Sequence, residues 1–301
     1  GVPGAQVPAI QAKDDTMTEG PRGFLSIVEV FPPSFGGAEK EPVLGLRQKT
    51  RDFVERVRRI QPYADVVLVA DVKDASRAKF SPVHAAALLR DETGVDAVPV
   101  VTARDSNRQA VTSSIVTALS LGLRGVMLVW GDRYGEEEGV RNVYDFASLS
   151  EVVAHARGLA DRAGGKCRIF APVNIAKLDG ARGVELAKSR IREGADYLLA
   201  QPPTVDAGPT LRFHEKILSK LGLKDRVIPN VFPFRDPADI EYCRKRFGWS
   251  IPPRMDEIAK GGEAELLKEA KKAAAGLAES GFSGVYVSTR GRPELARFIL
   301  D

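Results

Sequence analysis

The sequence predicts a (β/α)8 barrel, and three observations favour this fold class. Eight short apolar runs rich in β-branched residues recur along the 301 residues, and each is followed by a helix-like segment. Such runs, alternating with helices, are typical of buried parallel strands. Eight strand–helix pairs in about 280 residues match the repeat number and length of this barrel. A doubly wound open sheet is the rival, but the first strand leads into Pro32-Pro-Ser-Phe-Gly-Gly37, without the G-x-G-x-x-G spacing of such sheets.

The elements follow in a regular order. We expect strands at residues 24–31, 65–70, 97–102, 125–130, 168–173, 196–200, 226–231 and 283–288. Helices are expected at residues 45–60, 81–93, 107–121, 148–164, 181–193, 209–221, 237–246 and 263–279, with a last one at 293–300. Gly122 and Gly194 mark helix ends, and Pro237 opens a helix. Residues 23–301 therefore form one barrel domain in this interpretation.

The first 22 residues differ from the rest. They are rich in Gly, Pro, Ala and small polar residues and show no periodicity. We expect a disordered leader or a segment added by cloning, with Met17 as a candidate natural start.

Composition and charge narrow the class of protein. Apolar residues make up 44% and charged residues 28%, which is ordinary for a globular protein. The net charge of +4 is too small to indicate a nucleic-acid binder. No stretch approaches the roughly 18–20 apolar residues that span a bilayer, and no signal peptide is recognisable. Cys167 and Cys243 have no metal-ligand spacing around them, so we expect reduced, packed thiols in a cytoplasmic protein without a metal.

Polar residues stand inside or directly after the apolar runs, where the mouth of a barrel is built. They are Glu29, Asp71, Thr102, Asp132, Asn174, Gln201 and Asn230. Glu29 is the most informative, because a buried carboxyl is costly unless it has a role or a partner. Desolvation raises its pKa, which makes a general acid near neutral pH. Ile27 shares its strand face, so the pattern leaves a salt-bridged outer position open as well.

Asp132 and Gln201 are stronger candidates for a functional site because they belong to this set of polar residues at strand ends. Each has an ordinary explanation, since Gly-Asp after a strand is a common turn and a lone glutamine can cap a loop. The three histidines fall in expected helices and are interpreted as surface or packing residues. Lys73 and Lys177 follow strands, but neither has the apolar surroundings that lower the pKa of a Schiff-base lysine.

Six segments in order resemble one known family, the methylenetetrahydrofolate reductases, over residues 24–300. The segments are Val28-Glu-Val-Phe-Pro-Pro33, Val101-Thr-Ala-Arg-Asp-Ser-Asn-Arg108, Gly131-Asp132, Glu193-Gly-Ala-Asp-Tyr-Leu-Leu-Ala-Gln201, Val227-Ile-Pro-Asn-Val-Phe-Pro233 and Gly284-Val-Tyr-Val-Ser-Thr-Arg-Gly-Arg-Pro-Glu-Leu295. The second segment is most similar to the branch found with folate-dependent one-carbon and corrinoid pathways.

The resemblance implies a flavin-bearing barrel that reduces 5,10-methylenetetrahydrofolate to the 5-methyl form. Glu29 then matches the general acid, and Asp132 the carboxylate beside pterin and flavin. Gln201 matches the amide that binds folate, and Arg292 a basic residue near it. The implied cofactor contacts are Thr102, Trp130, Gly131, Tyr144, Lys188 and Arg190. The implied cofactor is FAD, with FMN as an alternative, and NAD(P)H or another reduced carrier is the electron donor.

The flavin half of the site departs from the family pattern. A Tyr-Pro-Glu-x-His segment reads Ala171-Pro-Val-Asn-Ile175 here, and other usual contacts are replaced by Ala70, Val100, Trp130, Gly183 and Leu186. Two alternatives therefore stay open: direct hydride transfer from a nicotinamide without flavin, or a non-reducing pterin- or flavin-binding subunit with a corrinoid or iron–sulfur partner. Two cysteines cannot hold a four-thiolate cluster, so any cluster belongs to that partner. We expect a homo-oligomer.

Overall fold

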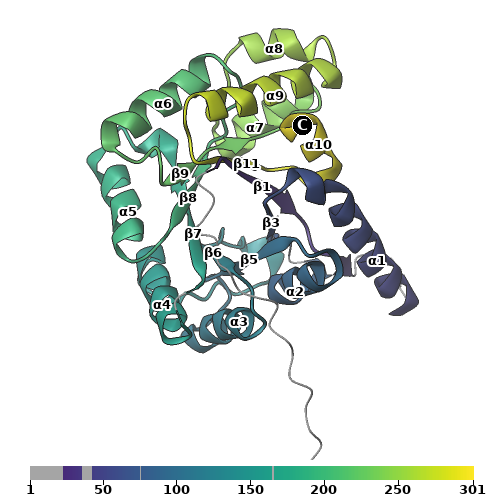
Figure 1. The fold of residues 1–301 in the computed structure, drawn as a ribbon, viewed down its shortest axis with the longest axis vertical. Coiled ribbons are helices and arrows are strands. Elements are labelled where there is room, and N and C mark those ends of the chain that lie inside the picture. Colours follow the sequence, from purple (N-terminus) through teal and green to yellow (C-terminus); the bar gives the residue numbers. More distant parts are fainter. Residues whose placement is uncertain (1–22, 36–42, 75, 165) are drawn as a thin grey trace, which may run out of the picture.

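The computed structural model describes residues 23–301 apart from residues 36–42, 75 and 165. The expectation for residues 1–22 lies outside the described residues. Figure 1 looks along a ring of strands with helices around it. The strands are β1 (Leu25–Val30), β2 (Ser34–Phe35), β3 (Val66–Val69), β4 (Ala78–Lys79), β5 (Asp96–Thr102), β6 (Gly125–Val129), β7 (Arg168–Asn174), β8 (Tyr197–Gln201), β9 (Val227–Ile228), β10 (Asn230–Val231) and β11 (Gly284–Val287).

The main sheet is parallel and nearly closed, which confirms the (β/α)8 barrel. Its order is β10-β11-β1-β3-β5-β6-β7-β8-β9 in the described part of the chain. One expected strand, residues 226–231, is divided into β9 and β10 at Pro229, because proline cannot donate a ladder hydrogen bond. β9 pairs with β8 and β10 pairs with β11, so this divided strand closes the ring.

The helices follow the strands as expected. They are α1 (Val43–Ile60), α2 (Pro82–Thr93), α3 (Arg108–Ser120), α4 (Leu149–Arg162), α5 (Ala181–Arg192), α6 (Pro209–Leu221), α7 (Pro237–Phe247), α8 (Arg254–Ala259), α9 (Glu263–Glu279) and α10 (Ala296–Leu300). Side-chain caps start three of them: Asn107 accepts from Ala110 N at 2.8 Å, and Ser148 and Asp236 act likewise for α4 and α7. α8 is an addition that the sequence pattern did not predict.

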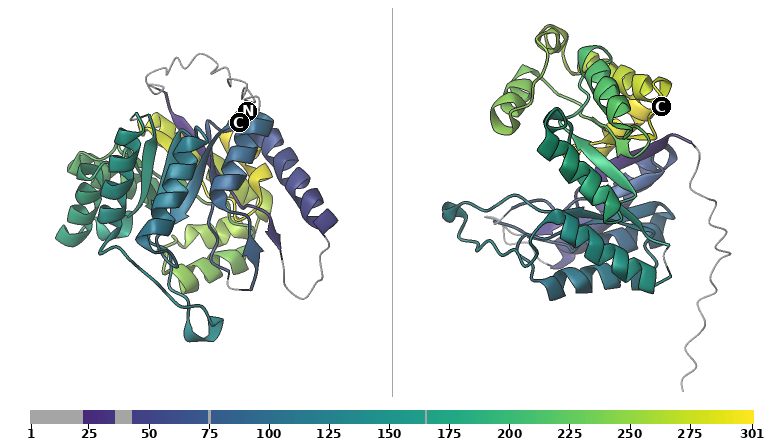
Figure 2. Two further views of the ribbon diagram at one scale, coloured as in Figure 1. Left: turned by 90° about the horizontal axis from the view of Figure 1, so that it is seen from below. Right: turned by 90° about the vertical axis from the view of Figure 1, so that its left-hand side faces the viewer.

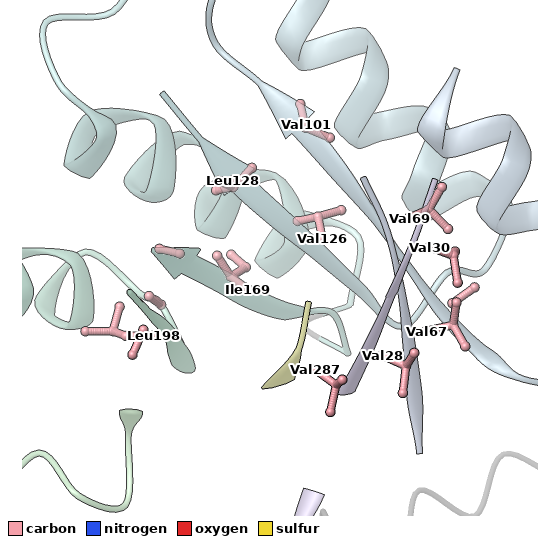
Figure 3. Packing of buried hydrophobic residues seen from close by; sticks show 14 of the residues in the cluster. Val28, Val30, Val67, Val69, Val101, Val126, Leu128, Ile169, Leu198 and Val287 are labelled. Atoms are coloured by element: carbon pink, nitrogen blue, oxygen red, sulfur yellow. The ribbon is translucent and has the colours of Figure 1, made fainter. Parts of the chain in front are cut away.

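Strand alternation divides the core into two layers. Side chains such as Val28, Val67, Val126 and Val287 face outward and pack under the helices, and Figure 3 labels ten members of this layer on successive strands. The inward face carries a separate, smaller cluster that fills the barrel. Its members are Leu25, Ile27, Val66, Leu68, Val98, Val100, Met127, Phe170, Leu199, Ile228 and Tyr286.

Two further features surround the barrel mouth. A third apolar cluster, which includes Phe232, Phe234 and Ile251, packs the segments around α7 and α8 onto the barrel. The segment that holds the short helix η2 (Glu136–Glu138) projects away from the barrel in both views of Figure 2.

Cys167 and Cys243 are free and buried, as expected. In the part of the chain that the structure describes, no helix is long and apolar enough to cross a membrane.

Candidate active site

Two adjoining pockets open where the parallel strands end. The outer pocket has a volume of about 740 Å³ and the inner pocket about 600 Å³. Both are lined by Glu29, Asp132, Asn174 and Gln201, so these strand-end residues form the boundary between them. Three of them, Glu29, Asp132 and Gln201, are strand-end residues that the sequence predicts to act together, and all three line both pockets.

Glu29 lies on the inward face of β1 and is held by two hydroxyl groups. Tyr286 Oη donates a hydrogen bond to Glu29 Oε1 at 2.6 Å, and Ser288 Oγ donates to Oε2 at 2.7 Å. Burial raises the pKa of Glu29, and the two donated hydrogen bonds oppose that shift without cancelling it. The salt-bridged outer position is therefore excluded, and Glu29 is a fixed carboxyl group whose proton is retained to higher pH than usual.

The turn after β6 brings Trp130, Gly131 and Asp132 into the inner pocket. Gly131 has a φ of 81°, and a Cβ there would lie 2.5 Å from Thr102 Cγ2, so only glycine fits this turn against the end of β5. Arg104 Nη1 donates to the carbonyl oxygen of Asp132 at 2.8 Å, which fixes the backbone that carries this carboxylate. Asp132 itself is exposed at the edge of both pockets.

Tyr144 supports this turn from behind. Its ring stacks on Trp130 with centroids 4.7 Å apart and planes at 12°, and its hydroxyl donates to Gly131 O at 3.0 Å. Tyr144 does not line either pocket, whereas Trp130 lines the inner one. The pair therefore presents Trp130 to the inner pocket with one of its faces already covered.

Two polar groups of the inner pocket have no protein partner. Thr102 Oγ1 is buried without a hydrogen bond, and so is the Nε of Arg190. The Nη1 of Arg190 donates to the carbonyl oxygen of Pro172, and burial lowers the pKa of its guanidinium. A hydroxyl and a guanidinium with unmet capacity suit a ligand that carries carbonyl or phosphate oxygens.

Two of the expected site residues lie elsewhere. Lys188 is exposed and lines a separate hollow between α5 and α6. Arg292 donates to Glu263 Oε1 at 2.6 Å and does not line the two mouth pockets. Arg290, two residues earlier, lines the outer pocket instead, has a φ of 50° and pairs with the buried Asp239.

The outer pocket also contains residues that the sequence pattern does not assign to the site. Its wall is aromatic, with Phe31, Phe213, Phe232, Phe247 and Trp249. His214 is buried there, with Nδ1 2.8 Å from Thr204 Oγ1, and burial lowers its pKa to about 4. It is the packing histidine that its helix position indicated, yet it faces the site. Asn174 and Asn230 stood out as polar residues at strand ends, which was the only signal for them.

One departure from the family pattern has a steric cause. Gly183 lies in the first turn of α5, and a Cβ there would lie 1.8 Å from the carbonyl oxygen of Lys177. Any larger side chain would require this backbone to move. Among the described residues, no group of three or more His, Cys, Asp or Glu side chains could hold a metal ion.

The comparisons with known proteins agree with this architecture. The family model described as methylenetetrahydrofolate reductase matches residues 25–275. No curated protein matches the sequence. The chain has the fold of an uncharacterized protein from Clostridium thermocellum that binds two copies of 5-methyl-5,6,7,8-tetrahydrofolic acid, with 12% identity, a TM-score of 0.59, and 92% and 95% of the two chains covered. The C-terminal domain of a protein named as a chitinase, from Desulfitobacterium hafniense DCB-2, is similar with 11% identity, a TM-score of 0.54, and 92% and 97% covered. Because the family model covers most of the sequence, this chain belongs to the methylenetetrahydrofolate reductase family.

Proposed function

We propose that this protein is an oxidoreductase that reduces a 5,10-methylene-tetrahydropterin, most simply the folate, to its 5-methyl form. The carrying observation is Glu29: a carboxyl group fixed by Tyr286 and Ser288, with a raised pKa, at the boundary of the two mouth pockets. A carboxyl group whose pKa is raised by burial keeps its proton to higher pH than an ordinary glutamate and can donate it to a substrate as a general acid.

The proton has a defined use in this reaction. Glu29 delivers it to N10 of the substrate as the bond between the methylene carbon and N10 breaks, which leaves a cationic iminium at N5. Asp132 lies on the boundary of the same pockets and stabilises that cation as a carboxylate. A hydride then adds to the methylene carbon, and its donor is oxidised by two electrons.

The inner pocket is the proposed cofactor side. Thr102 and Arg190 offer unpaired donors to oxygen atoms, and Trp130 offers an aromatic face. These features fit a flavin, which when bound supplies the hydride to the substrate and is itself reduced by NAD(P)H or another carrier. Five contact positions usual in the family are altered, so we expect one flavin to bind, FAD or FMN, but less tightly than in typical relatives.

The outer pocket is the proposed substrate side. Gln201 lines both pockets at the end of β8, which supports a role in bonding a pterin, and the aromatic wall of the outer pocket suits a flat ring system. The shared fold of a protein that binds a methylated tetrahydrofolate makes that pterin the first ligand to test. Arg292 and Lys188 do not line the two pockets, so we propose for them only contacts with parts of the substrate or cofactor that extend beyond these pockets.

The test has three readouts. Purified protein is examined for flavin absorbance, apo-protein is titrated with FAD and FMN, and turnover of 5,10-methylenetetrahydrofolate is measured with each reduced carrier. We expect saturable flavin binding and formation of 5-methyltetrahydrofolate. Turnover from a nicotinamide without flavin would replace the flavin step by direct hydride transfer. Pterin binding without turnover under any donor would refute the reductase and favour a non-reducing subunit that works with a partner protein.

A further inference from the structure

Asn230 is a polar residue on the inward face of the strand that closes the barrel. Ile228, two residues earlier, belongs to the inward cluster, and Val231 belongs to the outward one. Asn230 is in register with Tyr286, whose hydroxyl bonds Glu29. It therefore lies on the strand next to the tyrosine that holds the proposed acid, and, like Glu29, it lines the outer pocket.

The amide of Asn230 has no partner in the protein. The residue is 1% exposed, and neither Nδ2 nor Oδ1 makes a hydrogen bond. The backbone around it cannot turn to relieve this, because Thr204 N donates to Asn230 O at 2.7 Å and Tyr286 N donates to Pro229 O at 2.8 Å. A buried amide with both groups unpaired destabilises a fold, and an apolar residue would be the stable choice there.

We propose that Asn230 is a specificity-determining residue that pairs with a ligand in the outer pocket through both amide groups. The matching ligand presents a hydrogen-bond donor next to an acceptor on one edge, as the cyclic amide and amino group of a reduced pterin ring do. This rests on the proposed function, because it names the edge of the substrate that the site reads. Hydrogen bonds formed with the ligand offset the destabilisation that the unpaired amide causes in the ligand-free protein.

The chain offers a control in Asn142, whose amide oxygen and nitrogen each have a protein partner. Tyr134 N donates to Asn142 Oδ1 at 2.8 Å, and Asn142 Nδ2 donates to Tyr134 O at 2.9 Å. Asn230→Ala and Asn142→Ala are compared by thermal unfolding without ligand. We expect Asn142→Ala to lower the Tm by about 2–4 °C and Asn230→Ala to leave it within about 1 °C. A drop for Asn230→Ala as large as that for Asn142→Ala would show a structural role and overturn the proposal.

Binding is then measured by calorimetry under anaerobic conditions with 5-methyltetrahydrofolate and with the tail-free 6-methyltetrahydropterin. We expect Asn230→Ala to bind both probes about 10- to 100-fold more weakly and Asn142→Ala to bind them like wild type. Unchanged affinity in Asn230→Ala, with wild type binding, would overturn this inference alone. Loss for the folate but not for the tail-free ring would overturn the assignment to the ring edge. Wild-type protein that binds neither probe would overturn the proposed function together with it.

Discussion

Replacing Glu29 by Gln tests the proposed acid directly. Glutamine keeps the shape of the side chain but carries no proton to give. The carboxyl accepts hydrogen bonds at 2.6 and 2.7 Å from Tyr286 and Ser288. Glutamine keeps one acceptor, and the hydroxyl that faces its new amino group can rotate to accept.

The stability terms for this variant oppose each other. Both hydrogen bonds are kept, but each passes from an ionised carboxylate to a neutral amide, which costs about 1 kcal/mol per bond. At a pH where the buried carboxyl is ionised, its removal raises the free energy of unfolding by about 1.4 kcal/mol for each pH unit between its folded and unfolded pKa. Because the folded pKa is raised, Glu29 stabilises most when protonated, and that contribution is lost as pH rises through the folded pKa. The stability of Glu29→Gln relative to wild type should therefore improve with rising pH.

The loss of catalytic rate in Glu29→Gln should be larger than these changes in stability would suggest. Loss of a general acid typically lowers the rate by about 10²–10⁴-fold. The assay is anaerobic single-turnover formation of the 5-methyl product between about pH 5.5 and 9, a range that brackets a general acid working near neutral pH. Folding is checked by circular dichroism and urea denaturation. Glu185→Gln is the control, because Glu185 is exposed on α5 and pairs only with Arg192 in the described structure. Turnover by folded Glu29→Gln within tenfold of wild type would refute the acid role.

Tyr286→Phe gives an independent check of the same reasoning. The hydroxyl of Tyr286 lowers the pKa of Glu29 by donating to its carboxylate, so its removal should raise that pKa further. A general acid works in its protonated form, and its rate falls as pH rises through its pKa. The alkaline limb of the rate profile should therefore move to higher pH in Tyr286→Phe. A limb that stays in place or moves to lower pH would contradict this account.

Three other predictions concern the walls of the site. Gln201→Ala should weaken pterin affinity about 2- to 10-fold by calorimetry and leave flavin affinity alone, and unchanged pterin affinity would make Gln201 a loop cap. Gly131→Ala should lower the free energy of unfolding by about 2–4 kcal/mol in urea, because its φ is 81° and the new Cβ would meet Thr102 at 2.5 Å; a loss under about 0.5 kcal/mol would refute the steric argument. Burial lowers the pKa of His214 to about 4, so as the pH falls this histidine is protonated in the unfolded chain before it is protonated in the folded one. The free energy of unfolding of the wild type should therefore fall by about 3 kcal/mol between pH 7 and pH 4 because of this group. His214→Gln should lack that loss, and an equal acid sensitivity in both proteins would count against a neutral buried histidine.

The barrel itself could be predicted from the sequence because its signals are local. Apolar runs, helix periodicity and caps such as Asn107 and Asp236 depend on neighbours a few residues away. Parallel strands also end at one edge, so polar residues at strand ends had to meet there. For this reason the sequence alone was enough to group Glu29, Asp132 and Gln201.

Only the tertiary structure could decide how each side chain is used. Ile27 and Glu29 share a strand face, and closure of the ring made that face the interior. The turn after β11, with Arg290 at a φ of 50°, directs that arginine to the outer pocket, while Arg292 pairs with Glu263. Pairing between residues distant in sequence cannot be seen in a local pattern. For the same reason, only the folded chain reveals that the amide of Asn230 is buried without a partner.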